Sequence, residues 1–98
     1  MKELWLGLVE VIIEPDDSEN TKGFMNIVTW AETDAQFEEQ VNRCFHTYGW
    51  FLIGVEECAP IRVGYGYGEE VAEMIERARV NPLAVLYGTF HRYPSRPI

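Results

Sequence analysis

Apolar residues run together in four segments whose composition predicts β-strands. These segments are rich in Leu, Ile, Val and Trp, residue types that favour extended structure. They cover residues 4–13, 24–31, 50–57 and 83–90. A shorter segment, residues 61–65, follows Ala59-Pro60 and predicts a short further strand or an extended segment, which would form a hairpin with 50–57.

A helical pattern follows the second segment. Thr33 is a good N-cap residue, and Gln36 stands at the spacing of a capping box. Apolar residues then recur at helical spacing to about residue 47, before Gly49 ends the pattern. They are Phe37, Val41, Cys44, Phe45 and Tyr48.

A second helix is predicted from Glu69 to about Val80, because Pro82 cannot continue it. Its inner face carries Val71, Met74, Ile75 and Ala78. We therefore expect the two helices to supply the core residues Phe37, Val41, Phe45, Val71 and Ile75.

This order of elements is a leading strand followed by βαββαβ. It predicts an α+β fold, a ferredoxin-like two-layer sandwich with a mainly antiparallel sheet and both helices on one face. The chain has 98 residues, enough for one core, so residues 1–98 are expected to form a single domain. Residues 93–98 read as an extended C-terminal tail.

The strands carry apolar residues on both sides. In residues 50–55, Phe51, Ile53 and Val55 alternate with Trp50 and Leu52. A sheet with helices on one face would then expose a large apolar surface, which predicts a homodimer packed through that face. Alternatively, the leading strand or the tail covers the second face, or the strands lie centrally with both sides hidden.

The formal net charge of −8 comes from the first 39 residues, which carry ten acids and two bases. Negative charge repels phosphates and anionic lipids, so nucleic acid and membrane binding are disfavoured and a basic protein partner is possible. Glu14, Asp16, Asp17 and Glu19 predict an acidic loop that steers such a partner. The simpler interpretation is that the acids maintain solubility.

Residue patterns for catalysis or metal binding are weak. Cys44 and Cys58 are 14 residues apart without a CxxC motif, which predicts free thiols and no metal. The glycine-rich segment from Gly64 to Gly68 lacks the Lys-Ser/Thr of a phosphate-binding loop, so no cofactor is expected. With no secretion signal or glycosylation sequon in the sequence, a cytoplasmic location is expected.

Two functions remain open. The first is a small acidic cytoplasmic protein without enzymatic activity, a homodimeric protein-binding or regulatory module. The alternative is a small dimeric ferredoxin-like enzyme or small-molecule binder with an aromatic pocket between sheet and helices. The candidate binding residues of that pocket are Trp30, Trp50, Tyr87 and His91.

Overall fold

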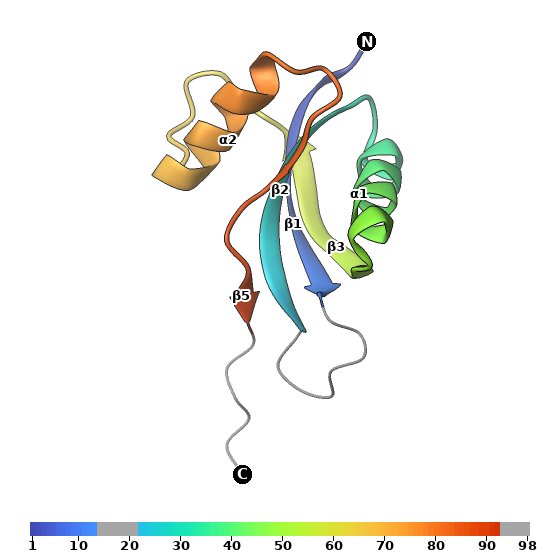
Figure 1. The fold of residues 1–98 in the computed structure, drawn as a ribbon. Coiled ribbons are helices and arrows are strands. Elements are labelled where there is room, and N and C mark those ends of the chain that lie inside the picture. Colours follow the sequence, from blue (N-terminus) through green and yellow to red (C-terminus); the bar gives the residue numbers. More distant parts are fainter. Residues whose placement is uncertain (14–21, 93–98) are drawn as a thin grey trace.

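Two long antiparallel strands occupy the centre of the sheet (Figure 1). The computed structural model describes residues 1–13 and 22–92. Strand β1 (Glu3–Ile12) pairs with β2 (Lys22–Ala31) along its whole length, from Glu3 opposite Ala31 to Ile12 opposite Lys22. The strands predicted over 4–13 and 24–31 are therefore confirmed. The leading strand is a central strand and not a cover for one face.

Three further strands complete the sheet, and all pair antiparallel. Strand β3 (Phe51–Pro60) lies beside β1, whereas β4 (Val85–Tyr87) and β5 (His91–Arg92) lie beside β2. The strand order is β3-β1-β2-β4, with β5 paired to β2. The chain is thus α+β with an antiparallel sheet, but the ferredoxin-like topology is not confirmed.

The predicted strand at residues 61–65 is wrong, because this segment turns away from the sheet edge. The Ile61 N–H still donates to the Leu4 carbonyl at 2.9 Å, but Tyr65 N–H then donates to the Arg62 carbonyl at 3.3 Å. Gly64 has a φ of 83°, a left-handed conformation that suits glycine. This turn ends the extended run and leads the chain to the second helix.

The helices α1 (Asp34–Tyr48) and α2 (Glu69–Arg79) lie on opposite faces of the sheet (Figure 1). Consecutive β2 residues show this, since Ile27 belongs to the cluster under α1 and Val28 to the cluster under α2. The expectation that both helices cover one face is therefore wrong. One helix on each face explains the apolar residues on the α1 face and those at the α2 end of the other face.

Helix α1 has the expected ends. The Thr33 hydroxyl accepts from Gln36 N–H at 3.1 Å, and the Gln36 side-chain oxygen accepts from Glu32 N–H at 2.6 Å. At the other end Gly49 adopts a φ of 78°, and Trp50 N–H donates to the Phe45 carbonyl at 2.9 Å. This pattern is a Schellman-type ending, and it folds Trp50 back toward the helix.

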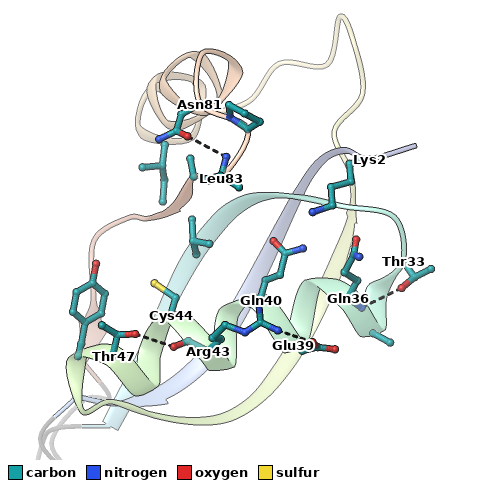
Figure 2. A pocket seen from close by; sticks show the side chains of 16 residues that line it. Lys2, Thr33, Gln36, Glu39, Gln40, Arg43, Cys44, Thr47, Asn81 and Leu83 are labelled. Carbon is teal, nitrogen blue, oxygen red and sulfur yellow. Dashed lines mark hydrogen bonds and ion pairs between the residues drawn. The ribbon is translucent and has the colours of Figure 1, made fainter.

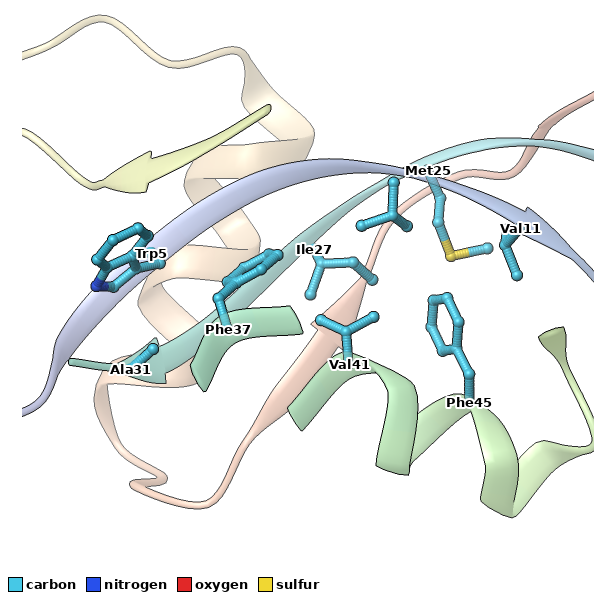
Figure 3. Packing of buried hydrophobic residues seen from close by; sticks show 9 residues of the cluster. Trp5, Val11, Met25, Ile27, Ala31, Phe37, Val41 and Phe45 are labelled. Carbon is cyan, nitrogen blue, oxygen red and sulfur yellow. The ribbon is translucent and has the colours of Figure 1, made fainter. Parts of the chain in front are cut away.

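The larger core fills the space between α1 and the sheet (Figure 3). The helix contributes Phe37, Val41 and Phe45, all fully buried. The strands supply residues that alternate along β1 and β2, as one face of a sheet requires. They are Trp5, Val9, Val11, Met25, Ile27 and Ala31.

The smaller core lies between α2 and one end of the other face. Met74, Ile75 and Ala78 are buried there against Val28 and Ala84, while Val71 is half-buried. Leu4, Leu6 and Leu86 pack against this cluster from the sheet. Of the five expected core residues, four are buried and Val71 is partly exposed.

The last predicted strand, 83–90, forms only in part. Tyr87 pairs with Ile27 and His91 with Phe24, so residues 88–90 contain one residue more than β2 offers opposite them. Such an extra residue is a β-bulge. It turns Thr89 toward α2, where the Glu70 carboxylate accepts hydrogen bonds from Thr89 N–H at 3.0 Å and from the Thr89 hydroxyl.

The acidic loop residues Glu14, Asp16, Asp17 and Glu19 and the tail 93–98 lie outside the described residues. Among the described residues, none of the helices is long and apolar enough to span a bilayer.

Candidate functional site

The four candidate binding residues do not form one site, because they lie on opposite faces of the sheet. Trp30 lies on the α2 face, where its indole N–H reaches the carbonyls of Ala78 at 2.9 Å and Asn81 at 3.1 Å. These carbonyls lie in the last turn of α2 and just after it, and each also accepts a backbone N–H, from Asn81 and Ala84 respectively. Trp30 therefore fastens α2 to the sheet, and this contact gives it a structural role.

Trp50 and Tyr87 do meet, on the α1 face, with a ring-centroid distance of 5.1 Å. Tyr48 joins them at 4.8 Å from Trp50 and 5.9 Å from Tyr87. We call Tyr48, Trp50 and Tyr87 the aromatic cluster. His91 is exposed and pairs with Phe24, whose partner Glu10 lies on the α2 face, so His91 is not part of it.

Tyr48 is the member of this cluster that the candidate set lacks. Its helical spacing suggests a core position, yet its side chain is 51% exposed. The sequence signal that reveals its surroundings is Tyr48-Gly49-Trp50, an aromatic pair across a helix-ending glycine. A left-handed glycine at that position brings the flanking residues back together.

A groove of about 850 Å³ lies between α1 and residues 81–86 (Figure 2). Gln36, Gln40 and Cys44 point into it from the helix, and Asn81 and Leu83 lie on the opposite wall. The buried Thr29 hydroxyl lies within hydrogen-bonding distance of two groups here, the Ala84 carbonyl at 2.8 Å and the Gln40 side-chain oxygen at 3.3 Å. The groove therefore combines amide and hydroxyl groups with apolar residues of the segment from Pro82 to Leu86.

Few charged side chains line this groove, and two of them form an ion pair with each other. Arg43 and Glu39 form an ion pair at 2.8 Å, one helical turn apart, and Lys2 lies at the other wall. Burial raises the pKa of the Cys44 thiol, against the opposing effect of a hydrogen bond with Tyr48. The neighbouring Cys44 in turn raises the pKa of Tyr48. Both groups are therefore neutral at pH 7, which does not favour a thiolate nucleophile.

An acidic surface lies at the other side of α1. Asp34, Glu38, Glu56 and Glu57 line a groove of about 420 Å³ beside Cys58. Burial raises the pKa of the Cys58 thiol, and the negative charges of Asp34 and Glu38 raise it further. Neither Cys44 nor Cys58 is in a disulfide, as the sequence predicts.

The second face of the sheet is covered by α2 at one end. At the other end the pairing places Phe51 beside Ile12, and Glu10 beside Phe24. Phe51 is 59% exposed and Ile53, at a bulge of β3, is 39% exposed, while Leu8, Ile12 and Phe24 are half-buried. We call Leu8, Ile12, Phe51 and Ile53 the open half of the sheet.

In the part of the chain that the structure describes, His, Cys, Asp and Glu side chains form no group of three suited to a metal ion. Comparison of the chain with family models, with curated proteins and with solved structures gives no match.

Proposed function

We propose that this protein is a protein-binding or regulatory module without enzymatic activity, and that it acts as a homodimer joined through the open half of the sheet. The supporting observation is the exposure of Phe51 and Ile53 on a sheet face that α2 covers at one end only. Exposed aromatic residues in such a patch are enriched at protein interfaces. A second copy would bury them against the same residues of its own sheet.

The sheet edges are poor alternatives for this contact. The register between β1 and β3 leaves Ile53 and Glu56 as extra residues, so β3 carries two bulges along its exposed edge. Residues 88–90 bulge the opposite edge. Bulges and charged residues such as Glu56 and Glu57 hinder the addition of another strand. Face-to-face packing therefore remains the favoured mode of association.

The proposal is tested by the mass of the full chain in solution. We expect sedimentation equilibrium to give twice the 11.3 kDa chain mass at micromolar concentration. Phe51→Asp should give the monomer mass, because it places a carboxylate in the contact. Tyr65→Asp is the matched control, since Tyr65 is 61% exposed but lies outside the open half. A monomer mass for the unaltered chain would contradict the proposal.

The proposed module is cytoplasmic and binds a basic protein, which the net charge of −8 supports.

The groove between α1 and residues 81–86 favours a second candidate, a small-molecule binder or enzyme, because its volume lies in the range of ligand sites. A screen of small polar compounds by NMR tests it. Shifts of the Gln40 and Cys44 amides would support this second candidate, and their absence would oppose it.

A further inference from the structure

A further groove lies on the α2 face, between the sheet and the loop that leads from β3 to α2. Its volume is about 580 Å³, which is within the range of ligand sites. Leu6 and Leu8 of β1 and Pro60 of β3 line it with apolar groups, and the loop contributes Tyr65 and Tyr67. We call it the tyrosine groove. It offers apolar and aromatic surface against which a ligand with an apolar body can pack.

The loop on one side of the tyrosine groove is fixed by hydrogen bonds. The Ile61 N–H donates to the Leu4 carbonyl at 2.9 Å, and the Arg62 N–H donates to the Tyr67 hydroxyl at 2.8 Å. The ring centroids of Tyr65 and Tyr67 are 4.8 Å apart, and Tyr67 also packs against the smaller core. The aromatic side of the groove is therefore formed before a ligand binds, which lowers the entropy cost of binding.

Three polar side chains line this groove without a hydrogen-bonding or ionic partner among the described residues. Asn26 is half-buried on β2, between the apolar Phe24 and Val28 of the same sheet face, and its side-chain amide is unpaired. The Glu57 carboxylate and the Arg62 guanidinium form no ion pair in this part of the chain. One amide and two opposite charges therefore remain for a ligand to satisfy.

The charges of the tyrosine groove are balanced. Among the described residues, Glu57 and Arg62 are the only ionised side chains that line it, because burial raises the pKa of the neighbouring Cys58 thiol and keeps it neutral at pH 7. A net anion would be repelled by Glu57 and by the chain's net charge of −8, and a net cation would be repelled by Arg62. A ligand with one positive and one negative group satisfies both residues.

We propose that the tyrosine groove binds a free, zwitterionic amino acid with an aromatic side chain. The ligand carboxylate pairs with Arg62, its ammonium group pairs with Glu57, and its ring packs on Tyr65 and Tyr67. This inference goes beyond the proposed function, because it gives the module a small-molecule ligand in a groove other than the one between α1 and residues 81–86. Phe51 does not line the tyrosine groove, so the dimer and the ligand are tested separately.

The probe is L-phenylalanine, and its binding to the unaltered full chain is followed by NMR. We expect a saturable shift of the Asn26 side-chain amide, with a dissociation constant of about 1 mM for a ligand of this size. L-Alanine lacks the ring and should bind about tenfold more weakly. An Asn26 amide that does not shift at tens of millimolar L-phenylalanine would contradict the proposal, and so would equal binding of the two amino acids.

Two blocked forms of the probe identify the charged contacts. N-acetyl-L-phenylalanine lacks the ammonium group and L-phenylalaninamide lacks the carboxylate, so each should bind the unaltered chain about fivefold more weakly. Glu57→Gln should weaken binding of L-phenylalanine about fivefold but not that of the N-acetyl form. Arg62→Gln should do the same for L-phenylalanine but not for the amide. Undiminished binding of either blocked form would indicate a peptide end as the ligand, and would overturn the proposal of a free amino acid.

The matched charge controls are Glu73→Gln and Arg77→Gln, which remove exposed charges of the same kind from α2, outside the tyrosine groove. Both should leave binding of L-phenylalanine unchanged.

The ring contact has a matched pair of its own. Tyr65→Ala should weaken binding of L-phenylalanine about fivefold, whereas Tyr48→Ala, at the end of α1 on the other face, should have no effect. Equal losses in a groove variant and in its control would contradict the proposal, because they would show a general effect of removing a charge or a ring.

Discussion

The two faces of the sheet differ in how completely a helix covers them. Under α1, three fully buried helix residues meet six sheet residues along most of β1 and β2. Under α2, a shorter helix covers one end, and Phe51 and Ile53 stay exposed at the other. Both faces have apolar residues, so the difference lies in helix length and placement. The α1 face holds the larger core, whereas among the described residues no helix lies over the open half.

The largest expected difference between the two faces appears when one aromatic ring is removed from each. Phe45→Ala should lower the free energy of unfolding by about 3–5 kcal/mol, because it empties a fully buried site. Phe51→Ala should cost the monomer less than about 1 kcal/mol, because the ring is 59% exposed. Urea denaturation at low protein concentration measures both. Equal losses would mean that the faces are equally packed.

Two glycines sharpen the same contrast. A Cβ at Gly7 would run into the Phe37 ring under α1, so Gly7→Ala should destabilise the protein by about 1–3 kcal/mol. Gly54 pairs with Glu10 on the other face and has nothing within 4 Å of an added Cβ. Gly54→Ala should therefore leave thermal stability unchanged or raise it slightly. A loss at Gly54 as large as at Gly7 would show that the open half is covered.

The attachment of α2 is tested at Trp30. Trp30→Phe keeps the ring contact but removes the indole N–H that Ala78 and Asn81 accept, at an expected cost of about 1–2 kcal/mol. Amide hydrogen exchange should then quicken in α2 more than in α1. Uniform quickening across both helices would show that Trp30 supports the whole fold and not α2 alone.

The smallest expected effect concerns Glu70, which holds the bulge of the last strand. Hydrogen bonds from Thr89 lower the pKa of the Glu70 carboxyl below its ordinary value of 4.5. A pKa lowered by folding stabilises the protein above the unfolded value, and this contribution is lost as the pH falls below 4.5 through the folded value.

In the Glu70→Gln variant, the melting temperature should therefore fall slightly less than in the unaltered chain as the pH is lowered. Thermal melts between pH 7 and pH 3 measure it, with Glu73→Gln as the neighbouring helix control. If both variants lose stability in parallel as the unaltered chain does, Glu70 has no special contact with Thr89.

Local signals in the sequence predict the elements well. Thr33, Gln36 and Gly49 mark the ends of α1, and Pro82 follows α2 closely, because caps and breakers act within a few residues. The apolar residues on both sides of β1 and β2 are confirmed as packing residues of two cores, but the prediction that both helices leave one whole face uncovered was wrong, since α2 covers one end of it.

The arrangement of elements could not be predicted because it depends on long-range pairing. Both one helix on each face and two helices on one face satisfy the same amphipathic stripes. The packing of α2 against Val28, a contact between residues far apart in the sequence, shows which arrangement the chain adopts. For the same reason Trp30 and Trp50 seem equivalent in the sequence but lie on opposite faces.

The central claim is that two copies of the chain contact each other through the open half of the sheet. Isotope-filtered NOE spectroscopy on a mixture of labelled and unlabelled chains tests this claim most directly. We expect intermolecular contacts at Ile12, Phe51 and Ile53, and none at the buried Val41 under α1. Intermolecular contacts confined to the bulged edge of β3 or to the α1 face, or the absence of any at millimolar concentration, would contradict this account.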